Sequence, residues 1–262
     1  MTIKDLADHL AQAHEKGEGV QPVISIKPDI TIDEAYHVQL ETIERELKKG
    51  AHITGKKIGL TSEAVQKALG VDEPDYGHLL NTMVIGNGET VPAGTLLQAK
   101  VEGEIAFILK DELKGPNVTP EEVLAATDYV LPALEIVDSR VKDWKITLAD
   151  TVADNASSGL YVLGGTPIKI ADVDLKKVEM SLYKNEELEN TGVGTATLGD
   201  PAICVAWLAN KLSQYDITLK PGEVILSGAL SAMVVAEPGD YFKATFSELG
   251  EVSVQFEKED TP

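Results

Sequence analysis

The chain has 262 residues, with 43 Asp and Glu against 23 Lys and Arg, which gives a formal net charge of −20 at pH 7. Such a charge repels nucleic-acid backbones and anionic lipid, so we expect neither nucleic acid nor a membrane as a partner. Hydrophobic residues make up 43% of the chain, and no apolar run approaches the ~20 residues of a membrane helix, which argues against a disordered, fibrous or membrane-spanning protein.

Helical patterns dominate the first seventy residues. Apolar residues recur at helical spacing up to Gly17, which ends the first predicted helix. Thr31 and Glu34 form a capping box that begins a second helix. A short strand over 52–60 then leads into a brief helix predicted over 63–69.

From residue 77 the pattern changes to short apolar or alternating runs separated by Gly, Pro and Asn turns, which predicts strands. The predicted strands cover 82–85, 99–109, 129–137, 159–163, 177–184, 223–226, 232–236, 240–246 and 252–256. Helices over 120–127 and from Asp200 onward interrupt them. Many short strands with few helices favour an α+β fold, with a helical N-terminal region over 1–76 and a β-rich catalytic core over 77–262.

Three glutamates occupy positions where a carboxylate is unusual. Glu102 and Glu104 share one face of a predicted strand, roughly 6.5–7 Å apart, and Glu135 lies alone in an apolar run. An unpaired buried carboxylate costs several kcal/mol, and a hard divalent cation with oxygen ligands would remove that cost. Alternatively, the first two glutamates face solvent on an edge strand, and Glu135 pairs with a basic residue such as Arg140.

A second group of polar residues precedes the strands. Strand alternation sends Lys56 and Lys57 to opposite faces, so we expect one to face water and one to face inward, although both are solvated in the simplest interpretation. Thr61 and Ser62 stand at a helix start, where free N–H groups suit a substrate carboxylate. Asp75 lies in a predicted turn, where it either caps the turn or acts as an acid/base group at a pocket mouth.

Other chemistries have little support in the sequence. There is no G-x-S-x-G, P-loop or G-x-G-x-x-G motif, and the five histidines all lie in the first third without zinc-ligand spacing. The single cysteine, Cys204, cannot form an internal disulfide, and we expect it to be buried and inert. The N-terminal stretch has no apolar signal core, so the expected location is cytoplasmic.

Six motifs occur in a fixed order along the chain. They are GKKIGLTS at 55–62, PDYG at 74–77, EGEIA at 102–106, EIVDSR at 135–140, DTVADNAS at 150–157 and ILSGAL at 225–230. The set resembles the hydratase/decarboxylase branch of the fumarylacetoacetate hydrolase superfamily over nearly the whole chain. Within that branch it resembles most the 2-hydroxypenta-2,4-dienoate (2-oxopent-4-enoate) hydratases of the catechol meta-cleavage pathway.

The resemblance implies a fold and a set of site residues. It implies a mixed β-roll core of the fumarylacetoacetate hydrolase type and a Mg²⁺ or Mn²⁺ site on Glu102, Glu104 and Glu135. It makes Lys57 the inward lysine and Asp75 its acid/base partner. It also implies a homo-oligomer. A related decarboxylase is a further expected partner, with which the protein would form a complex.

The expected activity is the addition of water to 2-hydroxypenta-2,4-dienoate, which gives 4-hydroxy-2-oxopentanoate. Candidates for binding the carboxylate of this small 2-hydroxy-dienoate or 2-oxo acid are Thr61, Ser62, Ser157 and Ser158. Hydrolysis of a C–C bond is disfavoured, because the hydrolases of the superfamily usually have an aspartate where Glu135 stands and use a His–Glu pair.

Two alternatives remain open from the sequence. One is a metal-dependent 4-oxalocrotonate (2-oxo-3-hexenedioate) decarboxylase, and the other is a non-catalytic partner subunit of such an enzyme. The decarboxylases of this branch carry an apolar residue in place of Asp75 and Gly-Gly in place of Gly228-Ala229, so both positions favour the hydratase.

Overall fold

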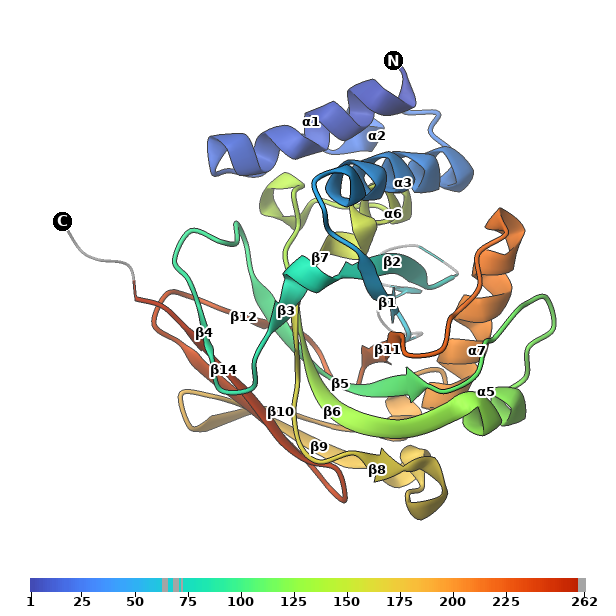
Figure 1. Ribbon diagram of the computed structural model, residues 1–262. Helices are drawn as coiled ribbons and strands as arrows, with labels where there is room; N and C mark the ends of the chain where they lie inside the picture. Colours follow the sequence, from blue (N-terminus) through green and yellow to red (C-terminus); the bar gives the residue numbers. More distant parts are fainter. Residues whose placement is uncertain (63–65, 68–70, 72, 259–262) are drawn as a thin grey trace.

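A computed structural model describes residues 1–62, 66–67, 71 and 73–258. The chain forms two β-sheets, with a layer of N-terminal helices above the larger one (Figure 1). None of the helices in the described ranges is long and apolar enough to cross a membrane. The predicted helix over 63–69 lies mostly outside the described residues.

The helices begin where the sequence offers N-terminal caps. In α1 (Ile3–Lys16) and α3 (Ile32–Lys48) the side chains of Thr2 and Thr31 accept hydrogen bonds from the backbone N–H of the third helical residue, whose carboxylate accepts one from the backbone N–H of the cap residue. Gly17 ends α1 in a left-handed conformation (φ 68°) that suits glycine. The helices are α1 (Ile3–Lys16), α2 (Val23–Ile26), α3 (Ile32–Lys48), α5 (Pro120–Ala126), α6 (Leu148–Ala153) and α7 (Pro201–Leu212). Both N-terminal helices and both later helices that the sequence predicts are confirmed.

The larger sheet has the order β2-β1-β11-β5-β6-β7-β3, with β12 beside β5 and β8 beside β6; the smaller has the order β10-β9-β13-β14-β4. The strands are β1 (Ile53–Gly59), β2 (Asp75–Leu80), β3 (Val84–Ile85), β4 (Thr90–Val91), β5 (Lys100–Leu109), β6 (Thr127–Val137), β7 (Ser158–Leu163), β8 (Ile168–Lys169), β9 (Glu179–Lys184), β10 (Glu187–Val193), β11 (Val224–Ala229), β12 (Val234–Val235), β13 (Tyr241–Phe246) and β14 (Gly250–Phe256). The long strands β5 and β6 curve strongly, so the larger sheet is curled (Figure 1). The α+β fold class is therefore confirmed.

Each predicted strand is present, but β2, β4, β8 and β10 are additional. All six residues of β2 are buried, so its sequence lacks the alternation of a half-exposed strand. β10 is a polar edge strand that pairs with β9 through backbone hydrogen bonds, which need no apolar side chains.

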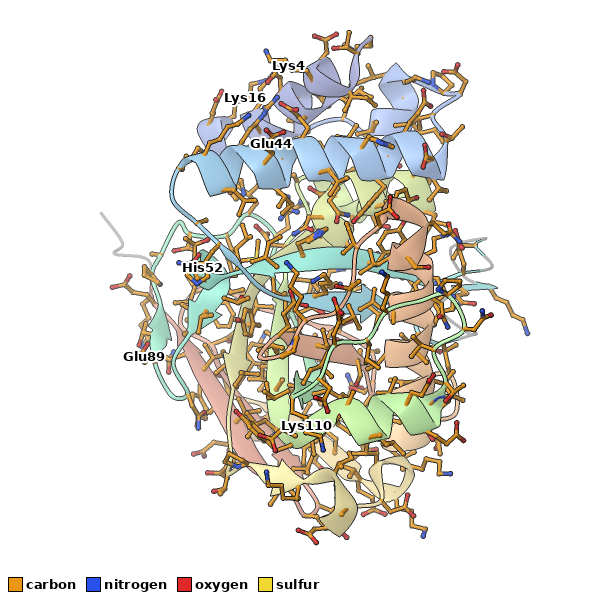
Figure 2. The ribbon with its side chains drawn as sticks, turned by 45° about the vertical axis from the view of Figure 1, so that its right-hand side comes forward. Lys4, Lys16, Glu44, His52, Glu89 and Lys110 are labelled. Carbon is orange, nitrogen blue, oxygen red and sulfur yellow. The ribbon has the colours of Figure 1, made fainter. Side chains whose placement is uncertain are left out.

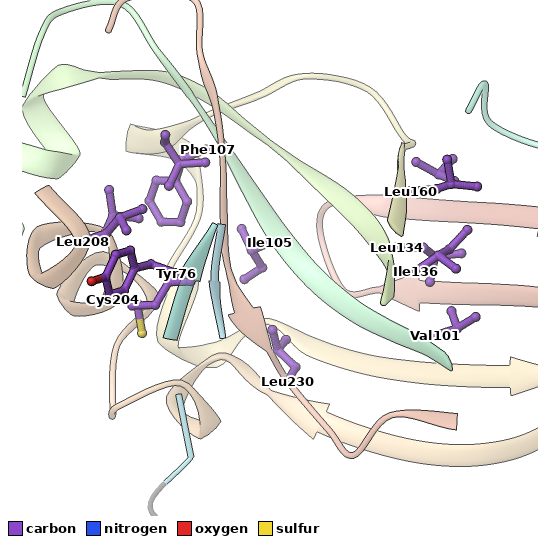
Figure 3. Close-up of a cluster of buried hydrophobic side chains, with 14 of the residues drawn as sticks. Tyr76, Val101, Ile105, Phe107, Leu134, Ile136, Leu160, Cys204, Leu208 and Leu230 are labelled. Carbon is purple, nitrogen blue, oxygen red and sulfur yellow. The ribbon is translucent and has the colours of Figure 1, made fainter. Parts of the chain in front are cut away.

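The two faces of β5 have different surroundings. Ile105 and Phe107 point into the main hydrophobic core, near Cys204 and Leu208 of α7 (Figure 3). The alternate residues face the other side, where Ala106 lies in a smaller apolar cluster with residues of β2, β6, β7 and β11. This second face is the one that carries Glu102 and Glu104.

The predicted division of the chain at residue 76 stays a prediction. The larger sheet includes β1, which precedes that residue, and β2, which crosses it. The structure therefore brings residues from both predicted regions into one sheet, and this shared sheet carries the candidate site.

Candidate active site

The three glutamates meet because of strand register. In the antiparallel pair β5–β6, Glu102 lies directly opposite Glu135, and Glu104 is the next residue on the same face of β5. Each of the three offers a carboxylate oxygen within 4.8 Å of the others. Glu104 and Glu135 are almost fully buried, whereas Glu102 is partly exposed. The trio predicted from the sequence is therefore a single cluster that opens at Glu102.

Several oxygens of this cluster have no hydrogen-bond partner among the described residues. They are Oε1 of Glu104 and both carboxylate oxygens of Glu135, and all three are buried. Oε1 of Glu135 forms an ion pair with Lys57 at 3.2 Å, so Oε1 of Glu104 and Oε2 of Glu135 are the two with no partner of either kind within the described ranges. The other Glu104 oxygen accepts a hydrogen bond from the backbone N–H of Gly228 at 2.8 Å. Buried carboxylate oxygens without donors are costly unless a cation binds them, and an all-oxygen donor set fits Mg²⁺, Mn²⁺ or Ca²⁺.

The electrostatics of the trio also favour a cation. Burial and the neighbouring Glu135 raise the pKa of Glu102 to about 8. Burial and the other two carboxylates raise the pKa of Glu104 well above its usual value, and burial raises that of Glu135. The shift of Glu102 means that this carboxyl is largely protonated at neutral pH unless positive charge is supplied, and burial disfavours the charged form of all three.

Lys57 supplies one positive charge at the edge of the trio. It lies on β1, with 3% of its surface exposed, and its Nζ is 3.2 Å from Oε1 of Glu135. Its ammonium also donates a hydrogen bond to the carbonyl of Ala156 at 3.0 Å. Burial opposes the charge, but Glu135 and Asp75 outweigh it and raise the pKa of Lys57. Lys57 therefore faces inward, as the resemblance implies.

The expectation that the other lysine faces water is wrong. Lys56 is buried, and its Nζ lies 2.7 Å from both carboxylate oxygens of Glu223. β1 is an interior strand between β2 and β11, and Glu223 immediately precedes β11, so a counter-charge is available inside the protein. The two lysines do point to opposite faces, but each face is buried and each provides an acidic partner.

Asp75 is the first residue of β2, opposite Gly59 on β1, and it is buried. Its Oδ1 has no hydrogen-bond partner in the described part of the chain. A Cβ at residue 59 would collide with this oxygen and lie 3.1 Å from Nζ of Lys57, so Gly59 leaves the space in which Asp75 and Lys57 approach each other. Burial raises the pKa of Asp75, and Lys57 partly offsets that shift.

The four hydroxyl residues predicted to bind substrate lie in two places. Thr61 is buried against Gly228, where any side chain at residue 228 would collide with its hydroxyl, so it lies beside the backbone that contacts Glu104. Ser62 follows it and is partly exposed. Ser157 and Ser158 are buried, and their hydroxyls donate to Oδ2 of Asp154 and the carbonyl of Asn155. Their role toward a substrate stays a prediction.

The sequence reasoning missed the backbone groups of the site. The backbone N–H of Gly228 contacts Glu104, and the carbonyl of Ala156 contacts Lys57. Gly59, which has no side chain, leaves space for Asp75. The only signal in the sequence is that all three belong to the six ordered motifs. Motif membership cannot show which backbone group points at which side chain.

Comparisons with known proteins find relatives over nearly the whole chain. Residues 52–257 match the family described as fumarylacetoacetate (FAA) hydrolase C-terminal. The chain is 47% identical over 254 residues to a 2-keto-4-pentenoate hydratase from Paraburkholderia xenovorans (strain LB400), which covers 97% of this chain and 94% of the relative. It is 51% identical over 216 residues to a 2-hydroxypent-2,4-dienoate hydratase from Pseudomonas putida, which covers 82% of this chain and 97% of the relative.

Solved structures also resemble the chain over its length. The 4-oxalocrotonate decarboxylase from Pseudomonas putida G7, complexed with magnesium and adipate, has a TM-score of 0.94 and 36% identity, with 97% of each chain covered. The same enzyme complexed with calcium and acetate has a TM-score of 0.92 and 35% identity, with 97% and 96% covered. The expected fold, a curled mixed sheet with N-terminal helices, is thus confirmed.

Proposed function

The chain belongs to the fumarylacetoacetate hydrolase family, and from this premise we propose that it is a divalent-metal-dependent hydro-lyase. The proposed reaction adds water to 2-hydroxypenta-2,4-dienoate (2-oxopent-4-enoate) and gives 4-hydroxy-2-oxopentanoate, a step in meta-cleavage degradation of aromatic compounds. The names of relatives at 47% and 51% identity support this reaction.

The observation that carries the proposal is the trio of carboxylates, two of them buried, beside Lys57 and Asp75. Glu102, Glu104 and Glu135 would hold the metal, and their unpartnered oxygens support that role. A bound Mg²⁺ or Mn²⁺ would supply a Lewis acid for the negative charge that develops on the C2 oxygen of the substrate. This local positive centre also explains how an acidic protein accepts an anionic substrate.

The side chains around the trio can carry the proton transfers. Ketonisation moves the proton of the C2 hydroxyl to C5, and water then adds its oxygen to C4 and its proton to C3. Lys57 and Asp75 share the gap above Gly59, and Oδ1 of Asp75 is free to accept a proton. Burial shifts the pKa of Asp75 upward, toward the range useful for acid/base work near neutral pH. Thr61, Ser62, Ser157 and Ser158 are the candidates for the substrate carboxylate.

The second candidate function is decarboxylation of 4-oxalocrotonate. The TM-score of 0.94 to a 4-oxalocrotonate decarboxylase favours it as a rival. Identity to that enzyme is 36%, against 47% to a hydratase over the same share of this chain. Release of CO₂ from 4-oxalocrotonate by the purified protein would support the decarboxylase in place of the hydratase.

The test is the ultraviolet decay of 2-hydroxypenta-2,4-dienoate with Mg²⁺ or with EDTA, together with identification of the product. We expect decay to 4-hydroxy-2-oxopentanoate only with the metal, and a Glu104→Gln variant that stays folded but loses the metal-dependent rate. Glu44→Gln is the matched control, since Glu44 is exposed on α3 far along the chain from the trio (Figure 2). Full activity after EDTA treatment would contradict the metal role.

Two further parts of the proposal rest on the family resemblance: the protein would form a homo-oligomer and associate with a related decarboxylase. Its proposed location is the cytoplasm. Light scattering of the purified protein, alone and mixed with such a decarboxylase, tests both assemblies; a monomer that stays separate in the mixture would contradict them.

A further inference from the structure

A left-handed turn connects α6 to β7 beside the candidate site. Its three residues, Asn155, Ala156 and Ser157, have φ values of 54°, 50° and 51°. Non-glycine residues rarely adopt this conformation, which costs of order 1–3 kcal/mol at each position. Three such residues in succession persist only when contacts with the surrounding structure stabilise them. The contacts of the turn therefore indicate which feature of the site depends on this conformation.

Arg140 holds the turn from one side. Its guanidinium donates hydrogen bonds to the carboxylate and the carbonyl of Asp154, just before the turn, and to the carbonyl of Ser158, just after it, at 2.8 Å. The other Asp154 oxygen accepts from the backbone N–H of Arg140 at 3.0 Å and from the Ser157 hydroxyl at 3.1 Å. The planar fork of an arginine therefore spans both ends of the turn, which a lysine cannot do.

β2 holds the turn from the other side. The side-chain amide of Asn155 accepts from the backbone N–H of His78 at 2.7 Å and donates to the His78 carbonyl at 2.9 Å. A Cβ at Gly77 would lie 2.5 Å from the Asn155 carbonyl, so the turn packs directly on the glycine backbone. The turn is thus fixed against the strand that begins with Asp75.

Together, the contacts with Arg140 and with β2 fix the direction of the Ala156 carbonyl. The Ala156 carbonyl accepts a hydrogen bond from Nζ of Lys57, whose ammonium touches Glu135 as well. A right-handed backbone at residue 156 would turn this peptide plane and remove the acceptor. The ammonium is therefore positioned by Glu135 and by the turn together.

We propose that Arg140 is a positioning residue, which clamps the turn and so fixes the Ala156 carbonyl and the ammonium of Lys57 beside the carboxylate trio. The inference rests on the proposed function, in which Lys57 takes part in the reaction. Arg140 contacts the turn and lines a cavity of about 430 Å³. The trio, Lys57 and Asp75 do not line that cavity, and each nitrogen of the guanidinium already donates to a protein oxygen.

The test is a double-mutant cycle on the Mg²⁺-loaded protein with 2-hydroxypenta-2,4-dienoate. Arg140→Met should lower kcat by roughly 10²-fold, the effect of misplacing a reacting group by about 1 Å, with KM changed by less than about threefold. In a Lys57→Met background the same substitution should cause no further loss, because both changes remove one contribution. Arg140→Lys should behave like Arg140→Met, since it lacks the fork.

A matched control separates positioning from general destabilisation. Arg45 is also partly buried and paired, with Asp8 and Glu41 on the helical layer, so Arg45→Met should lower the melting temperature and leave kcat unchanged. If Arg140→Met does not fold, Gly77→Ala pushes the turn from the β2 side and should show the same non-additivity with Lys57→Met.

Two outcomes would overturn the inference: an unchanged kcat in Arg140→Met, or losses that multiply in the double variant. An unchanged kcat together with a raised KM would mean that Arg140 contacts substrate. An inactive wild-type protein would instead contradict the proposed function, so the two failures are distinguishable.

Discussion

Metal binding should release protons, because the pKa of Glu102 is raised above neutral pH when no cation is present. The pKa of Glu102 lies at about 8, so about nine in ten Glu102 carboxyls carry a proton at pH 7. A cation needs the ionised form. Glu102 alone should therefore release about 0.9 proton per Mg²⁺ at pH 7 and about 0.1 at pH 9. The raised pKa values of Glu104 and Glu135 can only add to the release near neutral pH.

Isothermal titration calorimetry measures this number directly. Titrating Mg²⁺ into the protein in Pipes and in Tris, which differ in ionisation enthalpy, gives the protons released from the slope of the observed enthalpy. The affinity should also rise by up to about tenfold per pH unit below pH 8 for each proton displaced. Glu102→Gln is the control, and it should reduce the release at pH 7 by about one proton. Zero release at pH 7, with an affinity that is flat from pH 6 to 8, would refute the reasoning.

The same shift fixes the sign of the pH dependence of stability. The folded-state pKa of Glu102 is raised above the usual 4.5, so its contribution is fully present below pH 4.5 and is lost as the pH rises through about 8. The metal-free protein should lose roughly 1.4 kcal/mol per pH unit from such a group across that window. Saturating Mg²⁺ should flatten this decline in urea unfolding, and an opposite slope without metal would contradict the shift.

Three further predictions concern single side chains. Lys56→Met should lower the free energy of unfolding by about 3–5 kcal/mol in urea titrations, because it leaves Glu223 buried and unpaired; a cost below ~1 kcal/mol would show that the pair is solvated. Ala156→Gly should be neutral or stabilising by up to about 1 kcal/mol in thermal unfolding, since glycine tolerates φ near 50°, and clear destabilisation would contradict a left-handed residue there. Asp75→Asn should lower the hydration rate by ~10²–10⁴-fold; if hydration persists and only ketonisation slows, the role assigned to Asp75 is wrong.

Local patterns were sufficient to predict much of the molecule. Thr31 and Glu34 define the start of α3 through contacts three residues apart, and alternation places Glu102 and Glu104 on one face. Glu135 is recognisable in the sequence as a carboxylate in an apolar run. Its position directly opposite Glu102 cannot be predicted from the local sequence, because it depends on the register of two strands about thirty residues apart.

Contacts between distant segments account for what was missed. Lys56 finds its counter-charge in Glu223, 167 residues away, so nothing in the local sequence distinguishes it from a solvated lysine. β2 follows Pro74 and begins with Asp75, which favours a turn locally, yet it is fully buried between neighbouring elements. Burial on both faces removes the alternation by which a strand is recognised.

The proposed proton-transfer groups and the proposed metal ligands reach the site from separate stretches of the chain. Lys57 and Asp75 lie on β1 and β2, whereas the glutamates lie on β5 and β6. Substitutions in the first stretch can therefore alter the proton-transfer groups while the carboxylate trio stays unchanged, and the reverse also holds. Such independence allows one scaffold to support different reactions, and this chain shares its architecture with a 4-oxalocrotonate decarboxylase although its relatives in sequence include hydratases.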